Sequence, residues 1–395
     1  MMTQRFQFNM LCGISAQVME GLKADIAFCH PAITKVLLID SGDGIIELEV
    51  RDGLTESEGE DLQRQVANVV EMSVKSYRFV EDISPFWSHE STQPYHGSEA
   101  VREFTKKYII ELGPGQYAFH GPATKLYMYF CDRIQKLAED MGAEFWHLPS
   151  IEMSHDLIPK TGYFALHPHL VTFGYRLPPH YERIRDFASE AKKKMLSSVE
   201  DSRILEPTGF ILEPVVCHNI YRSLKNQRLS EGRIITAQGK CYRYEGFRFL
   251  PLLRQWEYSM REVVLIGERD FIAEARQRCL ELTQAMVIEM DLTATLQIAT
   301  DPFFTSAAVS ARTFQIMQTA KLELCLQIGE GNSTAAASFN LHDKHFTEPM
   351  EIHDTNNRVL ETACVGWGIE RWMAAFVARW SEDPTKWPDP VKFTS

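Results

Sequence analysis

The sequence predicts an α+β fold in which helices flank a mainly antiparallel sheet, preceded by a small α/β domain. From about Gly209 onward, β-rich segments alternate with turns, and few helical segments interrupt them. The strongest helical pattern, residues 124–141, places its apolar side chains on one face. Residues 1–100 differ in charge, because 16 acidic and 7 basic residues give them about −9 of the net −12. We therefore expect two domains, an acidic one at 1–100 and a second at 101–395.

The N-terminal domain is expected to combine a β-hairpin with a helix. Two β-rich segments, 35–39 and 45–50, flank a turn sequence rich in glycine and aspartate. Apolar residues from Leu62 to Val70 then recur at helical spacing behind an acidic first turn. The acidic surface is interpreted as a solvated face, and a surface shaped for a basic partner is the alternative. A polar segment at 89–97 is the expected linker.

The second domain is expected to contain further helices at 180–195 and 270–290. The predicted strands lie at 233–237, 240–245, 261–267, 322–328 and 335–340. Residues 144–149, after the first strong helix, are interpreted as a strand closed by a proline. Residues 383–395 form a polar, proline-containing tail.

Composition excludes several classes of function. The 41 basic and 53 acidic residues make extended binding to nucleic acid unfavourable, although a small anionic ligand at one site is compatible with them. No apolar segment reaches the roughly 18 residues of a membrane span, and the N-terminus lacks the pattern of a signal peptide. Eight cysteines occur singly, with no Cys-x-x-Cys pair, which is typical of reduced thiols. We therefore expect a cytoplasmic protein without a membrane contact.

Two segments carry arginines in patterns that suit phosphate binding. In residues 241–245, Arg243 and Glu245 lie two apart, so on a strand their side chains would share a face. In residues 364–371, two glycines allow a helix to begin close to a sheet, and Arg371 falls in its first turn, where it suits a terminal phosphate. Taken singly, neither pattern is specific, and the Arg-x-Glu pattern is also explained by a surface ion pair.

In this order, the segments resemble the catalytic domain of class II aminoacyl-tRNA synthetases, over roughly residues 105–380. Residues 243–245 are similar to motif 2 of that family, and residues 366–371 are similar to its motif 3. Residues 126–149 resemble motif 1, the dimerisation element, so the resemblance implies a homodimer.

The resemblance also implies roles in binding ATP, together with Mg²⁺. Arg243 would contact the α-phosphate and Glu245 the adenine amino group. Arg254 and Arg371 would hold the β- and γ-phosphates, and Tyr258 would stack on the adenine.

A third feature is a set of two cysteines and a glutamate. Cys217 lies 45 residues before Glu262 and 147 before Cys364. Such long spacings alone do not indicate a metal site and are better explained by two buried thiols and a surface glutamate. However, Glu262 ends the second motif-2 strand and Cys364 directly precedes motif 3, which resembles the zinc-ligand layout of atypical archaeal seryl-tRNA synthetases and of their truncated relatives, the amino acid:[carrier protein] ligases. The resemblance therefore implies Zn²⁺ bound by three ligands with an open position.

Further matches to these relatives are residues 260–267, 301–304 and 337–340. By this resemblance Ser338 and Asn340 would line the amino-acid pocket, and Trp367 either borders that pocket or packs in the core. Two histidine pairs, His342 with His345 and His167 with His169, lack an HExxH pattern or a third ligand. They are interpreted as loop or substrate-proximal polar residues rather than as metal sites.

The resemblance implies activation of a small amino acid as an aminoacyl-adenylate. Its transfer to the phosphopantetheine thiol of a holo acyl or peptidyl carrier protein is the preferred interpretation, because the acidic N-terminal domain would repel tRNA. The alternatives are tRNA charging of the seryl-tRNA synthetase type, a non-catalytic regulator, or another small acceptor. The chain departs from both patterns, since the truncated relatives lack such an extension and the full synthetases carry a larger one. Lys192, Lys193 and Lys194 are the candidate surface for carrier docking, and a solvated helix face is the alternative.

Overall fold

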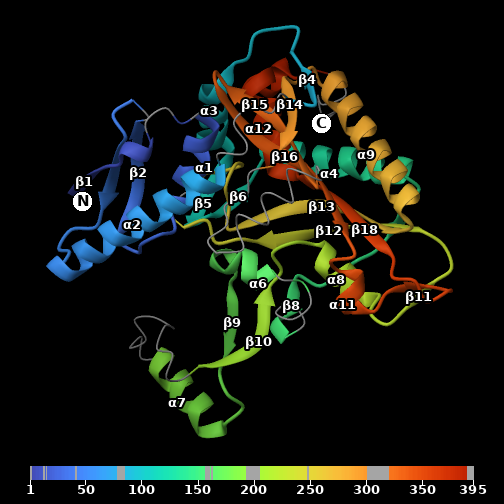
Figure 1. Ribbon diagram of the computed structural model, residues 1–395, viewed down its shortest axis with the longest axis horizontal. Coiled ribbons are helices and arrows are strands. Elements are labelled where there is room, and N and C mark those ends of the chain that lie inside the picture. Colours follow the sequence, from blue (N-terminus) through green and yellow to red (C-terminus); the bar gives the residue numbers. More distant parts are fainter. Residues whose placement is uncertain are drawn as a thin grey trace.

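The computed structural model describes residues 2–11, 14, 16–40, 42–77, 85–155, 161, 163–192, 205–246, 249–299 and 320–388. Figure 1 shows a small N-terminal unit beside a larger unit built on a long sheet, from which a narrow arm projects. The match at 301–304, and Lys193 and Lys194, lie outside the described residues.

The N-terminal unit is a three-stranded antiparallel sheet covered by helices. Strand β3 (Ile45–Val50) lies between β1 (Met2–Gln7) and β2 (Ile33–Asp40), and β2 and β3 form the predicted hairpin. Helices α1 (Ala16–Ile26) and α2 (Glu56–Tyr77) belong to the same unit. Leu62, Val66 and Val70 of α2 are buried in a core of the unit's own, as their helical spacing predicts.

The larger unit contains an eight-stranded sheet. Its strands run in the order β4 (Trp87–His89), β14 (Ala294–Ile298), β15 (Lys321–Gly329), β16 (Asn332–Asp343), β18 (Glu361–Gly368), β13 (Glu257–Gly267), β12 (Arg233–Tyr242) and β7 (Glu144–Phe145). All neighbours are antiparallel except β12 and β7, which are parallel. The predicted antiparallel α+β architecture is confirmed.

One face of this sheet is covered by four helices that share its main core: α3 (Gly97–Tyr108), α4 (Pro122–Asp140), α9 (Arg269–Glu289) and α12 (Ile369–Trp380). The opposite face packs against α8 (Cys217–Ser223) and α11 (Thr347–Met350) in a second, smaller core. Beside that face lie the small sheet β8 (Ile151–Met153), β10 (Glu206–Leu212) and β9 (Phe173–Arg176), the helix α6 (Tyr163–Leu166), and the strand pair β11 (Arg228–Leu229) and β17 (His353–Asp354). A hairpin of β5 (Ile109–Gly113) and β6 (Gln116–Phe119) joins α3 to α4.

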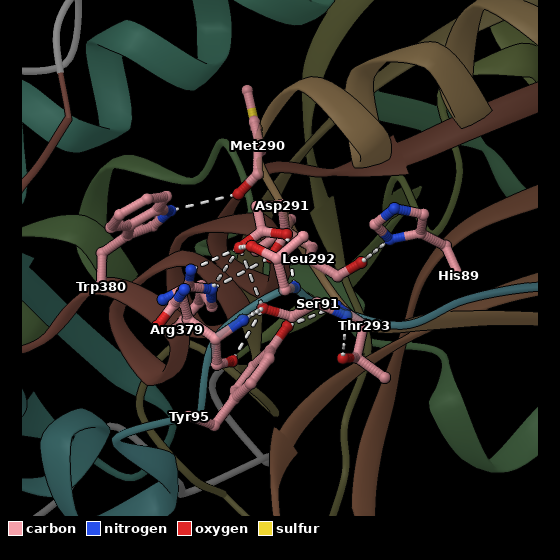
Figure 2. A network of polar contacts seen from close by, with 11 residues as sticks. His89, Ser91, Tyr95, Met290, Asp291, Leu292, Thr293, Arg379 and Trp380 are labelled. Atoms are coloured by element: carbon pink, nitrogen blue, oxygen red, sulfur yellow. Dashed lines mark hydrogen bonds and ion pairs between the residues drawn. The ribbon is translucent and has the colours of Figure 1, made fainter.

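The segment expected to be a linker is part of the larger unit. Strand β4 pairs with β14, and Asp291, in the turn after α9, accepts a backbone hydrogen bond from Thr92. The Arg379 side chain of α12 donates to the same carboxylate, and Tyr95 accepts a hydrogen bond from the amide of Thr293 (Figure 2). The boundary between the two units therefore falls between Tyr77 and Trp87, and not at residue 100.

One predicted element ends earlier than expected. The two strands predicted within 233–245 form a single strand, β12, which ends at Tyr242. Beyond this end, the amide of Tyr244 donates to the Leu170 carbonyl instead of to β13. Helix α7 (Tyr181–Lys192) lies on the arm between β9 and β10 and has no buried side chain (Figure 1). None of the helices in the described part of the chain has the length and apolar character that crossing a bilayer requires.

Candidate active site

The three predicted metal ligands meet on the sheet face that α8 covers. Cys217 begins α8, Glu262 lies in the middle of β13, and Cys364 lies on the neighbouring strand β18. Their ligand atoms all lie within 4.8 Å of one another, and each residue is only 3–4% exposed. The backbone amide of Cys217 also donates a hydrogen bond of 2.7 Å to Oε2 of Glu262. Residues far apart in sequence thus form one compact cluster of two thiols and a carboxylate.

The charges of this cluster are strongly coupled. A hydrogen bond between the two thiols lowers the pKa of Cys364 well below its usual value and raises that of Cys217 well above it. Burial, and then the neighbouring Cys364, raise the pKa of Glu262 to about 8. Cys217 and Glu262 therefore retain their protons at neutral pH unless a cation replaces them. Two sulfurs and one carboxylate are a donor set that fits zinc, with a fourth position left open.

Strand β16 adds polar side chains to the same face. The Asn340 amide donates to Ser338 Oγ at 3.1 Å and to Cys364 Sγ at 3.4 Å. His342, two residues further on, places Nε2 3.3 Å from Cys364 Sγ. The predicted pocket residues Ser338 and Asn340 therefore lie beside the cluster. The contact of His342 was missed, although the alternation Ser338, Asn340, His342 on a strand predicts a shared face.

Buried carboxylates next to the cluster were also missed. Glu213 is 1% exposed and accepts a hydrogen bond of 2.8 Å from Asn219. Burial, followed by the charges of Glu152 and Glu262, raises its pKa to about 9, so it is protonated at neutral pH. Glu152 is equally buried and lies 3.3 Å from His218 Nδ1. In the sequence, Glu213 lies four residues before the predicted ligand Cys217, and this short separation could have identified it as a neighbour of the cluster.

The motif-2 residues lie where the chain leaves β12 and returns to β13. Arg243 donates from Nε to the Pro214 carbonyl at 3.1 Å, and its guanidinium lies 5.5 Å from the centre of the Tyr258 ring. The positive charge of Arg243 also acts on Glu262 and lowers its pKa, against the effect of burial. Glu245 and Arg254 form an ion pair of 3.2 Å. Arg243 and Glu245 lie just beyond the end of the strand, rather than on it as predicted.

Arg371 lies in the first turn of α12, as predicted from the glycines before it. It donates to the carbonyls of Leu253 at 2.9 Å and of Ala335 at 2.8 Å. Burial, and then the positive charge of Arg254, lower its pKa, which indicates that the two guanidinium groups lie near each other. Two neighbouring cations suit a ligand with several phosphate charges.

Trp367 does not line the pocket. Its side chain is fully buried in the main core on the helix-covered face, where its indole donates to Thr283 Oγ1 of α9 at 3.1 Å. Since Trp367 is three residues from Cys364 on β18, the two side chains point to opposite faces of the sheet. The alternative interpretation, packing in the core, is the one the structure supports.

The remaining predicted residues lie outside the cluster. Lys192 is exposed at the end of α7, on the arm. Neither histidine pair, His342 with His345 or His167 with His169, forms a three-ligand group within the part of the chain that the structure describes.

The chain is similar in sequence to two kinds of enzyme. It is 25% identical over 378 residues to the type-2 serine–tRNA ligase of Methanococcus maripaludis, covering 91% of this chain and 71% of that protein. It is 28% identical over 275 residues to amino acid–[acyl-carrier-protein] ligase 1 of Bradyrhizobium diazoefficiens, covering 68% of this chain and 82% of that protein. No protein-family model matches the chain.

Solved structures show the same fold. The Methanopyrus kandleri seryl-tRNA synthetase, in complex with Aquifex aeolicus tRNASec, matches with a TM-score of 0.68 and 19% identity over 99% of this chain and 76% of that one. Giardia lamblia prolyl-tRNA synthetase, in complex with prolyl-adenylate, matches with a TM-score of 0.53 and 10% identity over 72% of this chain and 54% of that one. The chain therefore has the fold of the class II aminoacyl-tRNA synthetases. Its sequence is similar to those of type-2 serine–tRNA ligases and of an amino acid–[acyl-carrier-protein] ligase.

Proposed function

We propose that this protein activates a small amino acid with ATP and transfers it to the phosphopantetheine thiol of a carrier protein. The observation that carries the proposal is the convergence of Cys217, Glu262 and Cys364 beside Arg243. A donor set with an open metal position suits substrate binding rather than a purely structural role.

The three ligands would hold a zinc ion, which supplies a Lewis-acid contact for the α-amino group of the substrate. Arg243 would neutralise charge on the α-phosphate, while Arg254 and Arg371 would hold the β- and γ-phosphates, together with Mg²⁺. Glu245 would accept from the adenine amino group and Tyr258 would pack on the adenine. Positioning and electrostatic stabilisation then provide most of the acceleration, because the substrate carboxylate is already ionised and needs no general base.

Ser338 and Asn340 would border the substrate, since both lie on the face of the metal cluster. We expect glycine, alanine or serine as the substrate. Pyrophosphate exchange measured with each of the twenty amino acids tests this step, and strong exchange with only a large aromatic or charged amino acid would contradict it.

One comparison supports a carrier protein as the acceptor. The relative from Bradyrhizobium is 28% identical and is matched over 82% of its length. The exposed helix α7 is the proposed docking surface, and in it Arg183, Arg185 and Lys192 alternate with Glu182, Asp186 and Glu190. Lys192 at its end, with Lys193 and Lys194 next in the sequence, would supply the basic side chains that meet the carrier.

The acceptor is tested by incubating the protein with a radiolabelled amino acid, ATP and either holo carrier, apo carrier or bulk tRNA. We expect a hydroxylamine-sensitive thioester on the holo carrier alone. Changing Lys192, Lys193 and Lys194 to glutamate should weaken transfer without altering pyrophosphate exchange. The matched control reverses the exposed lysines Lys107, Lys225 and Lys386, and it should transfer normally.

Charging of tRNA remains the second candidate, favoured by one observation. The part of the chain that follows the N-terminal unit, residues 85–395, contains only 311 of the 395 residues. A match to the serine–tRNA ligase over 91% of the chain must therefore include part of the N-terminal unit. The match to the carrier-protein ligase covers only 68% of the chain. Efficient charging of bulk tRNA without transfer to a holo carrier would favour this second function.

We also propose a homodimer through α4 and β7. Strand β7 is an edge of the large sheet, and Met128 on α4 and Phe145 on β7 are exposed apolar side chains, at 57% and 46%. Light scattering of the purified protein should give twice the chain mass, and Phe145→Glu should shift it toward the monomer.

A further inference from the structure

The N-terminal unit reaches the candidate site through the turn that follows α1. In this turn the amide of Phe28 donates to the Asp25 carbonyl at 3.2 Å, and the amide of Cys29 donates to the Ile26 carbonyl at 3.1 Å. The Asp25 side chain accepts a hydrogen bond from Ser73 of α2, which ties the end of α1 to the rest of the unit. Phe28 is therefore presented from a fixed turn.

The Phe28 ring lies close to the loop that joins β12 to β13. We call the described residues 243–246 and 249–256 the motif-2 loop. Gly246 of this loop has a φ of 65°, and a Cβ atom added there would lie 3.5 Å from Cε1 of Phe28 and 3.9 Å from the Ala27 carbonyl oxygen. A side-chain atom at this position would meet the N-terminal turn at an ordinary van der Waals distance, so Gly246 lies close to Phe28.

The same ring contacts a second segment that supports the loop. We call residues 167–172, between α6 and β9, the strap. Phe28 meets His169 of the strap edge to face, with ring centres 4.7 Å apart and an interplanar angle of 61°.

The strap in turn binds both limbs of the motif-2 loop. The amide of Tyr244, on the outgoing limb, donates to the Leu170 carbonyl at 3.0 Å. The indole of Trp256, on the returning limb, donates to Thr172 Oγ1 at 2.9 Å. Phe28 therefore lies where the N-terminal unit, the strap and the tip of the loop meet.

We infer that Phe28 is a positioning residue for the motif-2 loop, so that the N-terminal unit serves to hold the ATP-binding residues of the larger unit in place. The inference rests on the proposed function, in which Glu245 and Arg254, on either side of Gly246, bind ATP. A loop free to move would have to be ordered when ATP binds, and that ordering would weaken binding without altering the metal cluster.

The test compares Phe28→Ala with the full-length wild type in two measurements. Hydrogen exchange should accelerate in peptides covering 243–256, because the strap that accepts the hydrogen bond from the Tyr244 amide loses its contact with Phe28. The KM for ATP in pyrophosphate exchange should rise by about three- to tenfold, while the KM for the amino acid and the zinc content stay within about twofold. Phe28→Leu, which keeps an apolar contact, should restore most of the ATP affinity.

The matched control is Phe6→Ala, which removes another half-buried ring from the core of the N-terminal unit. It should leave exchange at 243–256 and the KM for ATP unchanged. Equal effects of both variants, or no effect of Phe28→Ala on either measurement, would overturn the inference. If the wild type shows no pyrophosphate exchange with any amino acid, the proposed activity fails, and the hydrogen-exchange comparison still decides whether Phe28 positions the loop.

Discussion

Along β13, β16 and β18, successive side chains point alternately to the helix-covered face of the large sheet and to the face that carries the candidate site. On the helix-covered face, Val263, Phe339 and Trp367 are buried in the main core. On the opposite face, the same strands present Glu262 and Cys364, with polar neighbours from β16. The strands and their backbone pairing are shared, and only the side chains differ.

The difference shows how one sheet separates stability from chemistry. The helix-covered face buries apolar side chains from four helices, so changes there should act on folding. The site face buries acidic groups whose pKa values are shifted, at some cost in stability, so changes there should act on ligand binding. Four predictions follow the comparison, from the largest expected effect to the smallest.

Changing Cys364 to serine should abolish zinc binding and adenylate formation together. We expect a loss of roughly 10³-fold or more in pyrophosphate exchange, because the substrate would lose its orientation. Metal analysis of dialysed protein should fall from close to one zinc per chain to almost none. Arg371→Ala is the control that should impair ATP use yet keep its metal. Active, carefully dialysed wild type without zinc would show that the ligand assignment is wrong.

Changing Trp367 to alanine should lower the free energy of unfolding by about 3–5 kcal/mol, because it opens a cavity in the main core. Urea denaturation measures the change. Ser338→Ala, on the site face of β16, is the matched control and should change stability by less than about 1 kcal/mol. Equal destabilisation by both substitutions would break the division between the two faces.

Changing Glu213 to glutamine should remove a pH dependence of stability. The folded state raises the pKa of Glu213 to about 9, whereas the unfolded state has its ordinary value near 4.3. The contribution of Glu213 to the free energy of unfolding is therefore fully present below about pH 4.3. It is lost progressively as the pH rises toward 9. Between pH 6 and 9, the wild type should lose roughly 4 kcal/mol more unfolding free energy than Glu213→Gln. If the unfolding free energies of the two proteins change equally between pH 6 and 9, Glu213 is not protonated in the folded state.

Changing His342 to glutamine should weaken zinc affinity by about tenfold, because His342 contacts the Cys364 sulfur without being a member of the three-ligand group. Competition with a zinc chelator measures this change, and stability should remain close to that of the wild type. His353→Gln, in the short strand β17, is the matched histidine control and should bind zinc normally. A loss of zinc as complete as in the Cys364 variant would mean that His342 is itself a ligand.

Much of the larger unit could be predicted because its elements are encoded locally. The apolar spacing of α4 matches the buried residues Leu126, Phe130 and Ile134, and the strands of the sheet follow the β-rich segments. The short strand β4 could not be predicted in this way, because its three residues become a strand only by pairing with β14. The boundary between the units was misplaced for the same reason.

By itself the sequence determined which residue types were available for chemistry: two cysteines, a glutamate and three arginines in the order of class II motifs. It also determined that side chains two apart on a strand share a face, which places Ser338, Asn340 and His342 together. Tertiary structure alone decided that Cys217 reaches Glu262 and Cys364, and that Phe28 contacts His169 close to Gly246. The physical reason is that a separation along the chain does not fix a distance in space, which only strand pairing and the packing of one element on another determine.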